Sequence, residues 1–325
     1  MASADRAILD VKRVLVLAPR GFCAGVERAV EAVERALAEY GPPVYVRKHI
    51  VHNEHVLRGL EAQGAIFVES EDDVPEGETL VLAAHGVPPE VHTRAAERGL
   101  LTIDATCPLV SKVHAEVRRY AAGGSHIVLI GHEGHDEIVG TRAEAPGAVV
   151  LVETVEQAQT LELDGSRAVS YVTQTTLAED ETADIIAVLE ERFPTIVGPR
   201  KADICYATTN RQRAVKDALA HIDRLLVIGS KESSNSNRLV EVARRGGIPA
   251  YLIGDEGEIE PAMLADAVTI GVTAGASTPE VLVRRVCDWF RQRGVVEIRE
   301  FGEVSENVSF APPNTGRART LPGAA

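Results

Sequence analysis

Three cysteines give this chain its clearest chemical signature, because each stands where an apolar, strand-like run gives way to a helical pattern. Cys23 follows VLVLA and precedes VERAVEAVERAL, Cys107 lies in LTIDATCPLVSKVHAEV, and Cys205 lies in KADICYATTNRQRAV. Backbone N–H groups and the positive end of the helix dipole at such a turn favour a thiolate. A thiolate there is suited to binding a metal or to reacting, although one such cysteine alone could equally be a small buried apolar residue.

Regular spacing sets these cysteines apart from isolated ones. They lie 84 and 98 residues apart, and a polar residue follows each after 28 or 29 residues: His52, His135 and Ser233. Another strand-like run in each third then ends in a further polar group: His85, Thr175 and Ser277. We interpret this as an internal threefold repeat of structure rather than of residue identity.

The elements that must position these residues follow an α/β pattern. Four strand-like runs in each third alternate with helical patterns, which predicts small parallel sheets flanked by helices. The expected division is an N-terminal extension (1–12), three similar domains (13–106, 107–204 and 205–300) and a tail (301–325), with 1–10 and about 306–325 flexible. Among the strand-like runs, VLVLA is counted with the first third of the chain, LTIDAT with the second and IVGPRKADI with the third. Because ligands bind beyond the carboxyl ends of such strands, pseudo-threefold symmetry would aim all three cysteines at one centre.

Composition narrows the class of protein. With 45% apolar and 25% charged residues, the 325-residue chain is typical of a soluble globular protein. A net charge of −14 argues against a general nucleic-acid surface. There is no apolar run of membrane-spanning length and no signal-peptide pattern, and four widely spaced cysteines do not form a disulfide framework. These features together predict a cytoplasmic protein in a reducing compartment.

The cysteines themselves favour an iron–sulfur cluster. Structural zinc usually takes four ligands, often from CxxC pairs, and this chain has no CxxC. Three thiolates on a four-iron cluster would leave one iron open to substrate. Catalytic zinc and unliganded thiols remain alternatives. Cys287, inside RRVCDWF, is expected to be a core residue.

The other polar residues favour an anionic ligand. His52, His85 and His135 each follow a strand-like run, and helix starts carry further hydroxyl and amide groups: Thr175, Thr176, Ser233, Ser234, Asn235 and Ser277. Each alone could be a structural histidine or a helix cap. Since no Walker-type loop or GxGxxG is present, the pooled donors indicate a phosphate or diphosphate held without Mg²⁺. Glu137 could donate protons if the site raises its pKa, or could merely pair with a helix dipole.

These same stretches make the chain resemble a known family. PRGFCAGVERAV, IVHN, AAHGVP, DATCPLVSKVH, IGHEGHDEIVGT, VTQTTL, VGPRKADICYATTNRQ, GSKESSNSNRL and GVTAGAST, spread over about residues 13–305, resemble the LytB-type 4-hydroxy-3-methylbut-2-enyl diphosphate reductases. The resemblance implies a trefoil-like fold around a central [4Fe–4S] cluster held by Cys23, Cys107 and Cys205. It implies a diphosphate site at His52, His85, Ser233, Asn235 and Ser277, with Ser234 adjoining. It also implies a substrate contact for His135, proton donation by Glu137, and a place near the substrate hydroxyl for Thr175, with Thr176 beside it.

The activity implied by this resemblance is a reductive dehydroxylation. Two electrons would convert the allylic diphosphate to isopentenyl or dimethylallyl diphosphate, the last step of the non-mevalonate isoprenoid pathway. Ferredoxin or flavodoxin would supply the electrons, and their docking surface is predicted at a basic run comprising Arg200, Lys201, Arg211, Arg213 and Lys216. The alternatives are an iron–sulfur hydro-lyase, which needs no electrons but uses closely spaced cysteines, and a non-catalytic iron–sulfur sensor, which would need a further module.

Overall fold

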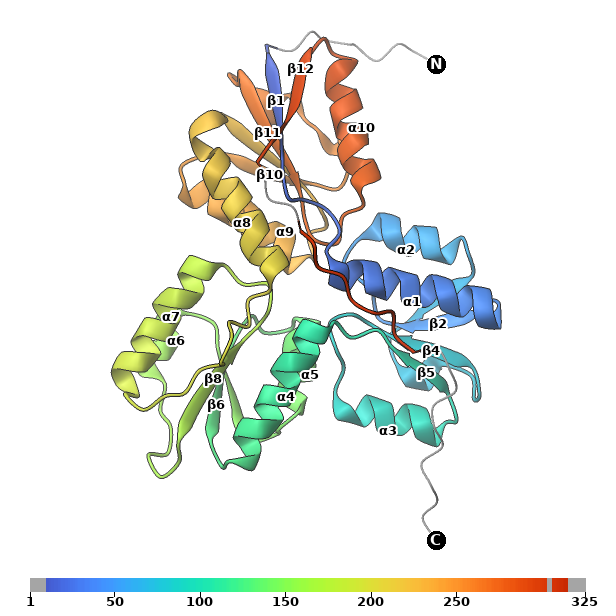
Figure 1. Cartoon of the computed structure of the whole chain (residues 1–325), viewed down its shortest axis with the longest axis vertical. Helices are drawn as coiled ribbons and strands as arrows, with labels where there is room; N and C mark the ends of the chain where they lie inside the picture. The colour runs from blue at the N-terminus through green and yellow to red at the C-terminus, as the bar shows by residue number, and fades with distance from the viewer. Residues whose placement is uncertain (1–9, 303–305, 315–325) are drawn as a thin grey trace.

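Three parallel sheets, each covered by helices, form three lobes around a common centre (Figure 1). The structure is a computed structural model that describes residues 10–302 and 306–314. The fold is therefore the predicted α/β arrangement of three similar units. The first lobe has the strand order β3-β2-β4-β5, the second β7-β6-β8, and the third β10-β9-β11-β1-β12.

The strands are short, and all nine pairings between them are parallel. In the first lobe they are β2 (Val44–Arg47), β3 (Ala65–Val68), β4 (Thr79–Leu82) and β5 (Leu101–Asp104). In the second lobe they are β6 (His126–Ile130), β7 (Val149–Val152) and β8 (Val169–Thr173). In the third lobe they are β1 (Arg13–Leu17), β9 (Arg224–Ile228), β10 (Ala250–Ile253), β11 (Thr269–Ala274) and β12 (Glu297–Phe301).

α-Helices join most successive strands, as parallel pairing requires. Short 3-10 helices join β3 to β4 (Glu71–Asp73) and β10 to β11 (Glu256–Glu258 and Pro261–Leu264). The first lobe contains α1 (Ala24–Tyr40), α2 (Glu54–Glu61) and α3 (Pro89–Glu97). The second contains α4 (Pro108–Ala122), α5 (Asp136–Ala143), α6 (Val155–Thr160) and α7 (Glu179–Arg192), and the third contains α8 (Tyr206–Ala218), α9 (Ser234–Arg245) and α10 (Glu280–Arg291). Helix α1 shows why these segments fold as they do. Its buried residues Ala29, Ala32, Val33 and Ala36 recur at helical spacing and form one apolar face.

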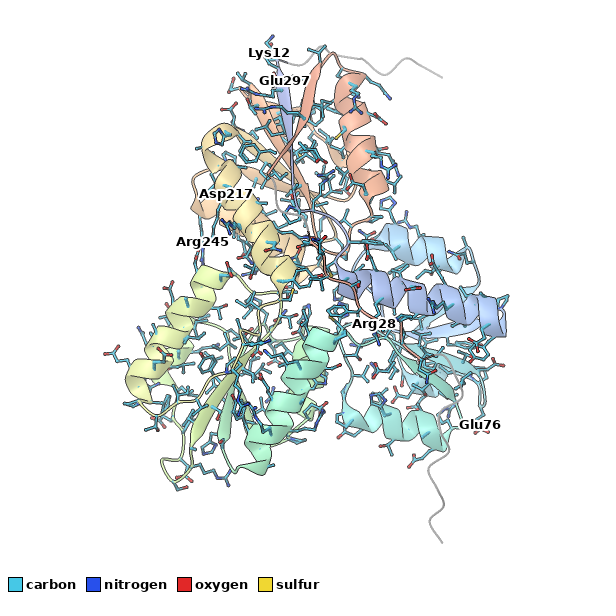
Figure 2. All side chains as sticks on the ribbon, in the orientation of Figure 1. Lys12, Arg28, Glu76, Asp217, Arg245 and Glu297 are labelled. Atoms are coloured by element: carbon cyan, nitrogen blue, oxygen red, sulfur yellow. The ribbon has the colours of Figure 1, made fainter. Side chains whose placement is uncertain are left out.

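Each sheet has an apolar cluster on both faces. In the third lobe, Val14 and Val16 belong to one cluster, whereas Leu15 and Leu17 of the same strand belong to another. This double burial explains why the strands read as continuous apolar runs rather than alternating ones. Charged residues such as Glu76, Asp217 and Glu297 lie at the periphery (Figure 2). Within the described residues, no helix combines the length and apolar character needed to cross a membrane.

The strands that lead into the cysteines do not belong to the lobes to which the sequence assigned them. β1 precedes Cys23, yet it pairs with β11 and β12 of the third lobe. β5 precedes Cys107, yet it pairs with β4 of the first lobe. The run IVGPRKADI forms no strand and makes a single bridge, from Val197 to Ser170 of the second lobe. Counting VLVLA, LTIDAT and IVGPRKADI with the thirds that contain the cysteines after them was therefore wrong, because each run pairs with strands of a different lobe.

Two further differences concern the end of the chain. β12 was not predicted, because its sequence EIREF is charged and the strand lies at the edge of its sheet. Residues 306–314, which were expected to be flexible, make the specific contacts described below. The remainder of the predicted flexible ends, 1–9 and 315–325, lies outside the described residues. Cys287 is buried in the third lobe beside Phe290, as expected.

Candidate active site

The three cysteines occupy equivalent positions at the amino ends of three helices. Cys23, Cys107 and Cys205 are the residues immediately before α1, α4 and α8, and these helix ends meet at the centre of the molecule (Figure 1). Pro108 at the first position of α4 fits a helix start, where its missing N–H is not needed. The arrangement directs three helix N-termini, with their positive dipole ends, toward one region.

A second set of equivalent contacts attaches each cysteine to the polar loop that follows a neighbouring strand. The backbone N–H of Cys23 donates to the carbonyl of Ala276 at 3.1 Å, next to Ser277. The N–H of Cys107 donates to Ala84 at 2.9 Å, next to His85, and that of Cys205 donates to Thr175 at 2.9 Å. The regular spacing of the cysteines and polar residues in the sequence therefore corresponds to three equivalent backbone hydrogen bonds in the structure. Each cysteine turn is bonded to a loop that presents a polar side chain.

One cavity of about 100 Å³ at the centre brings all the candidate residues together. Its lining includes every residue that the sequence predicted to bind metal, bind substrate or act in catalysis: Cys23, Cys107, Cys205, His52, His85, His135, Glu137, Thr175, Thr176, Ser233, Ser234, Asn235 and Ser277. These residues come from all three lobes, so the site exists only where the lobes meet.

The cysteine end of this cavity fits a group larger than one ion. The three Sγ atoms do not all lie within 4.8 Å of one another. In a tetrahedral zinc site, with Zn–S bonds of about 2.3 Å, sulfur ligands would be less than about 4 Å apart. Gly25 makes the close approach of the Cys107 side chain possible, because a Cβ at residue 25 would lie 2.7 Å from Cys107 Sγ and 3.8 Å from Cys23 Sγ. The three thiols are therefore spread more widely than the sulfur ligands of a single zinc ion.

Burial makes these thiols reluctant to ionise without a metal. It raises the pKa of Cys107 to about 12 and that of Cys205 to about 11, with the neighbouring cysteines adding to both shifts. It also raises the pKa of Cys23, against the opposing effect of nearby backbone N–H groups and Arg211. Three buried thiols that repel one another's charge would be ionised most readily by a cationic metal group bound between them.

Three histidines form a compact group on another wall of the cavity. The rings of His52 and His85 stack with centroids 4.1 Å apart, and His135 lies edge-on to them at 5.5 and 5.7 Å. Burial lowers the pKa of all three, that of His135 to about 4. Both ring nitrogens of His52 and Nδ1 of His85 are buried without a hydrogen-bond partner. Because buried polar groups normally have partners, these orphaned nitrogens point to an absent polar ligand.

His135 is oriented by the helix that it begins. It precedes α5, and its Nδ1 accepts a hydrogen bond from the backbone N–H of Glu137 at 3.2 Å. In a neutral imidazole, one nitrogen accepts and the other carries the proton, so this bond assigns the proton to Nε2. His135 is therefore arranged to act as a neutral hydrogen-bond donor.

The third lobe supplies hydroxyl and amide groups to the same cavity. Ser233 begins α9, and its Oγ accepts from the backbone N–H of Ser236 at 3.3 Å. Asn235 accepts from the N–H of Ala276 at 2.9 Å, and Ser277 donates to the carbonyl of His52 at 3.0 Å. These bonds fix the side chains at a helix N-terminus, which is a favourable place for an anion.

The surroundings of Glu137 in the second lobe favour its protonated form. Its carboxylate, 2% exposed, accepts from the backbone N–H of Thr175 at 2.7 Å and from Thr175 Oγ1 at 2.9 Å. Burial raises the pKa of Glu137 to about 7, although these two hydrogen bonds oppose the shift. A carboxylic acid with this pKa can release and regain a proton near neutral pH.

Thr208 and Tyr206, which line the cavity, and Gln174, which contacts its lining, were not predicted from the sequence. The hydroxyl group of Tyr206 accepts from the backbone N–H of Ala24 at 3.1 Å. Thr208 Oγ1 lies 3.1 Å from Cys205 Sγ and accepts from Asn235 Nδ2 at 3.3 Å, so it connects a cysteine to the anion wall. Gln174 is buried and donates to Thr176 Oγ1 at 2.9 Å and to Ser234 Oγ at 3.3 Å. Thr208 follows Cys205 by one helical turn, a spacing that could have identified it. Nothing in the sequence distinguished Gln174.

The basic run proposed for docking an electron donor does not form one surface. Arg211 is completely buried and pairs with Glu306 at 3.0 Å. Lys216 pairs with Asp180 at 2.8 Å. The inclusion of Arg211 in a surface patch was therefore wrong, because helix α8 turns this side chain toward the centre.

Comparison with known proteins identifies the family of this chain. Residues 14–291 match the LytB protein family. A curated 4-hydroxy-3-methylbut-2-enyl diphosphate reductase from Acidothermus cellulolyticus is 53% identical over 306 residues, covering 94% of this chain and 90% of the relative. The protein of the same name from Aromatoleum aromaticum is 52% identical over 305 residues, covering 94% of this chain and 98% of the relative.

Solved structures agree as well. The E-1-hydroxy-2-methyl-but-2-enyl-4-diphosphate reductase from Plasmodium falciparum superposes with a TM-score of 0.89 at 38% identity, covering 93% of this chain and 96% of that one. A structure described as (E)-4-hydroxy-3-methyl-but-2-enyl diphosphate reductase, the terminal enzyme of the non-mevalonate pathway, gives a TM-score of 0.61 at 30% identity, covering 87% and 100%. With the family match extending over most of the sequence and relatives identical at about half of their positions, the chain belongs to the LytB family.

Proposed function

We propose that this protein reduces 4-hydroxy-3-methylbut-2-enyl diphosphate to isopentenyl diphosphate and dimethylallyl diphosphate, the last step of the non-mevalonate isoprenoid pathway. The observation that carries the proposal is the single central cavity, in which three cysteines, three neutral histidines and a glutamate of raised pKa come together. The names of the related proteins support the same reaction.

Cys23, Cys107 and Cys205 would hold a [4Fe–4S] cluster, one thiolate from the start of each of three helices. When bound, the cluster would supply electrons one at a time and an iron that has no protein ligand. The helix N-termini favour the negative charge of the thiolates. Because the three Sγ atoms do not all lie within 4.8 Å of one another, a cluster is favoured over a single ion.

The diphosphate of the substrate would bind where donors lack partners. His52 and His85 offer unpaired ring nitrogens, and Ser233, Asn235 and Ser277 provide further polar groups near the N-terminus of α9. Ser234 lies between Ser233 and Asn235 in the chain, and its Oγ accepts from Thr176 Oγ1 at 2.9 Å. Fixing the diphosphate would orient the hydroxyl end of the substrate toward the cysteines. Because the substrate loses its translational freedom on binding, the barrier of the chemical steps that follow is lower.

Glu137 would provide the proton that allows water to leave. The reaction consumes two electrons and two protons: the C4–O bond breaks, one proton leaves with the hydroxyl group as water, and the other forms a C–H bond. Thr175, bonded to both oxygens of Glu137, is placed to relay that first proton and to position the hydroxyl group. His135, with its proton on Nε2, would contact the substrate as a donor.

The electrons must come from another protein, because the sequence contains no flavin or nicotinamide motif. Ferredoxin or flavodoxin is the donor class that we include in this proposal. The four free cysteines are consistent with a reducing, cytoplasmic compartment.

The test is anaerobic oxidation of reduced methyl viologen, started by adding the substrate. We expect substrate-dependent bleaching by protein loaded with iron and sulfide, and its loss in Cys205→Ser. If fully loaded protein gave no bleaching, the reductase function would be excluded. Consumption of substrate without oxidation of the dye would instead identify a hydro-lyase.

A further inference from the structure

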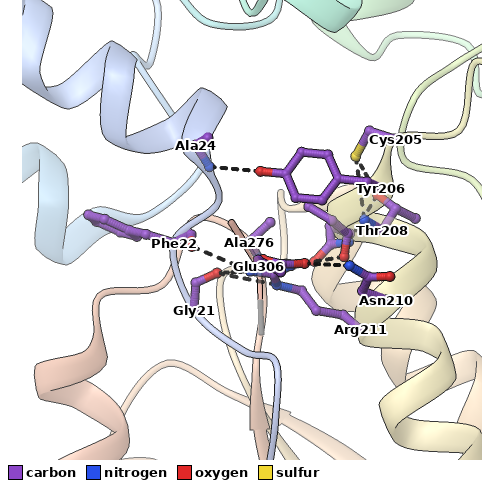
Figure 3. A network of polar contacts seen from close by, with 12 residues as sticks. Gly21, Phe22, Ala24, Cys205, Tyr206, Thr208, Asn210, Arg211, Ala276 and Glu306 are labelled. Carbon is purple, nitrogen blue, oxygen red and sulfur yellow. Dashed lines mark hydrogen bonds and ion pairs between the residues drawn. The ribbon is translucent and has the colours of Figure 1, made fainter. Parts of the chain in front are cut away.

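A buried arginine connects two of the cysteine turns. Arg211 lies on α8, six residues after Cys205, and its side chain is fully buried. It donates to the carbonyl of Gly21 at 2.7 and 3.2 Å and to that of Phe22 at 3.4 Å (Figure 3). Both carbonyls belong to the turn that ends in Cys23. Arg211 therefore ties the helix that begins at Cys205 to the turn that carries Cys23.

The charge of Arg211 is balanced by a residue from the end of the chain. Glu306 accepts from Arg211 Nη1 at 3.0 and 3.1 Å and from Asn210 Nδ2 at 3.0 Å (Figure 3). A buried guanidinium without a counter-charge would be strongly unfavourable. Glu306 thus neutralises a cation that would otherwise stand alone beside the cysteine turns.

The segment that follows Glu306 crosses the same region. Phe310 lines the central cavity. The carbonyl of Ala311 accepts from Arg28 Nε at 2.9 Å, and the same arginine donates through Nη1 to Thr106, the residue before Cys107, at 2.9 Å. Arg28 lies close to the centre of the three lobes (Figure 2). Arg211 and Arg28 thus hold Glu306 and Ala311 beside the cysteine turns, and Phe310, between them, lines the cavity that contains the three cysteines.

We propose that the C-terminal segment 306–314 is a working part of the cluster site, in which Glu306 and Arg211 set the charge beside the cysteines and Phe310 covers them. Arg211 and Glu306 are positioning residues, since neither lines the cavity. This inference rests on the proposed function, because it assumes a cluster bound to the three cysteines.

The charge pair is tested by the reduction potential of the reconstituted cluster. A nearby positive charge stabilises the more negative, reduced cluster. Glu306→Gln removes a negative charge and leaves the arginine, so the midpoint potential shifts to more positive values. Arg211→Met shifts it to more negative values. Glu306→Asp keeps the charge and should restore the wild-type potential, which a purely structural role of Glu306 does not predict.

A matched control comes from the same end of the chain. Glu297 is an exposed residue of β12 at the outer end of the third lobe, where it pairs with Arg299 at 3.3 Å (Figure 2). Glu297→Gln should leave the potential unchanged. If Glu306→Gln leaves it unchanged as well, or if both Glu306→Gln and Arg211→Met shift it in the same direction, the role of the charge pair is excluded.

The proposal that Phe310 covers the cysteines is tested by the rate at which a ferrous iron chelator removes iron from the reduced protein. Phe310→Ala opens the cavity, so iron loss should become about tenfold faster. Val308, an exposed residue of the same segment, provides the control, and Val308→Ala should react at the wild-type rate. Equal rates of iron loss for Phe310→Ala and Val308→Ala would show that Phe310 does not cover the cysteines. If the wild-type chain bound no iron or sulfide at all, the proposed function itself would fail, which separates the two outcomes.

Discussion

Thr175 donates both of its hydrogen bonds to Glu137, from its backbone N–H at 2.7 Å and from its Oγ1 at 2.9 Å. These bonds stabilise the carboxylate, whereas burial stabilises the acid, and burial is the larger effect. The balance leaves the pKa of Glu137 at about 7. The same threonine therefore orients the carboxyl group and limits how far its pKa rises.

Glu137→Gln should lose most of its turnover, because an amide cannot release the proton that the hydroxyl group needs. Removing a general acid typically costs about 10²–10⁴ in rate. Iron content and the affinity for inorganic diphosphate should stay at wild-type values, since Gln occupies the same space. Steady-state kinetics with reduced methyl viologen, together with iron analysis, provides the measurement. Normal turnover would assign the proton to another group.

Thr175→Val should move the pH profile without removing the acid. Loss of the Oγ1 hydrogen bond raises the pKa of Glu137 further above its ordinary value. Because activity requires the protonated form, the alkaline limb of kcat/KM shifts to higher pH. Thr176→Val, which removes a hydroxyl that does not contact Glu137, should leave the limb in place. A shift of the Thr175→Val limb to lower pH would contradict the proposed electrostatic balance.

The raised pKa also predicts a pH-dependent stability. Glu137 titrates near 4.5 when unfolded and near 7 when folded, so the folded protein binds more protons between these values. The stabilisation is fully present below pH 4.5 and is lost as pH rises to about 7, by up to about 3 kcal/mol. Urea unfolding of the cluster-free protein should show Glu137→Gln to be more stable than wild type at pH 8. Equal free energies of unfolding at pH 8 would show that burial does not raise the pKa of Glu137.

Gly25→Ala should separate cluster binding from folding. The new Cβ would lie 2.7 Å from Cys107 Sγ, and the cysteine can turn away at little cost to the fold. Alanine also favours the helix by about 1 kcal/mol. We expect a stable protein that binds much less iron. Gly59→Ala in α2, where a Cβ meets nothing within 4 Å, should keep full iron content. Full iron content in both variants would argue against a cluster in this space.

The histidine pair predicts that diphosphate binding takes up protons. Burial lowers the pKa of His52 and His85, so both rings are neutral in the free protein near pH 7. A bound anion raises both pKa values, and affinity should therefore increase as pH falls. Calorimetry of inorganic diphosphate binding in two buffers of different ionisation enthalpy measures the uptake. His52→Asn should reduce it. An uptake that is unchanged in this variant would place the protons elsewhere.

The sequence was most informative where chemistry depends on local structure. A strand, a turn and a helix follow one another in the chain, so the positions of Cys23, Cys107 and Cys205 at helix starts could be predicted. The polar residues after other strands were found in the same way, and all of them line the cavity. Their roles remain predictions until the variants are measured.

Long-range partners were not predictable by this route. β1 pairs with a strand more than 250 residues away in the chain. The local sequence pattern around β1 does not indicate which sheet the strand will join. Arg211 resembled a surface charge, because its burial depends on Glu306, which follows 95 residues later. The edge strand β12 alternates charged residues and offers little apolar signal.

The position of β1 has a consequence for how the chain is made. This strand is the first described element to leave the ribosome, yet its neighbours β11 and β12 are among the last. At typical rates of synthesis, of about 5–20 residues per second, β1 waits on the order of tens of seconds for them. The turn that carries Cys23 follows β1 directly, so the first cysteine to be made is among the last to reach its final place. A cluster that needs all three thiolates is therefore expected to enter only after the chain has been completed and released.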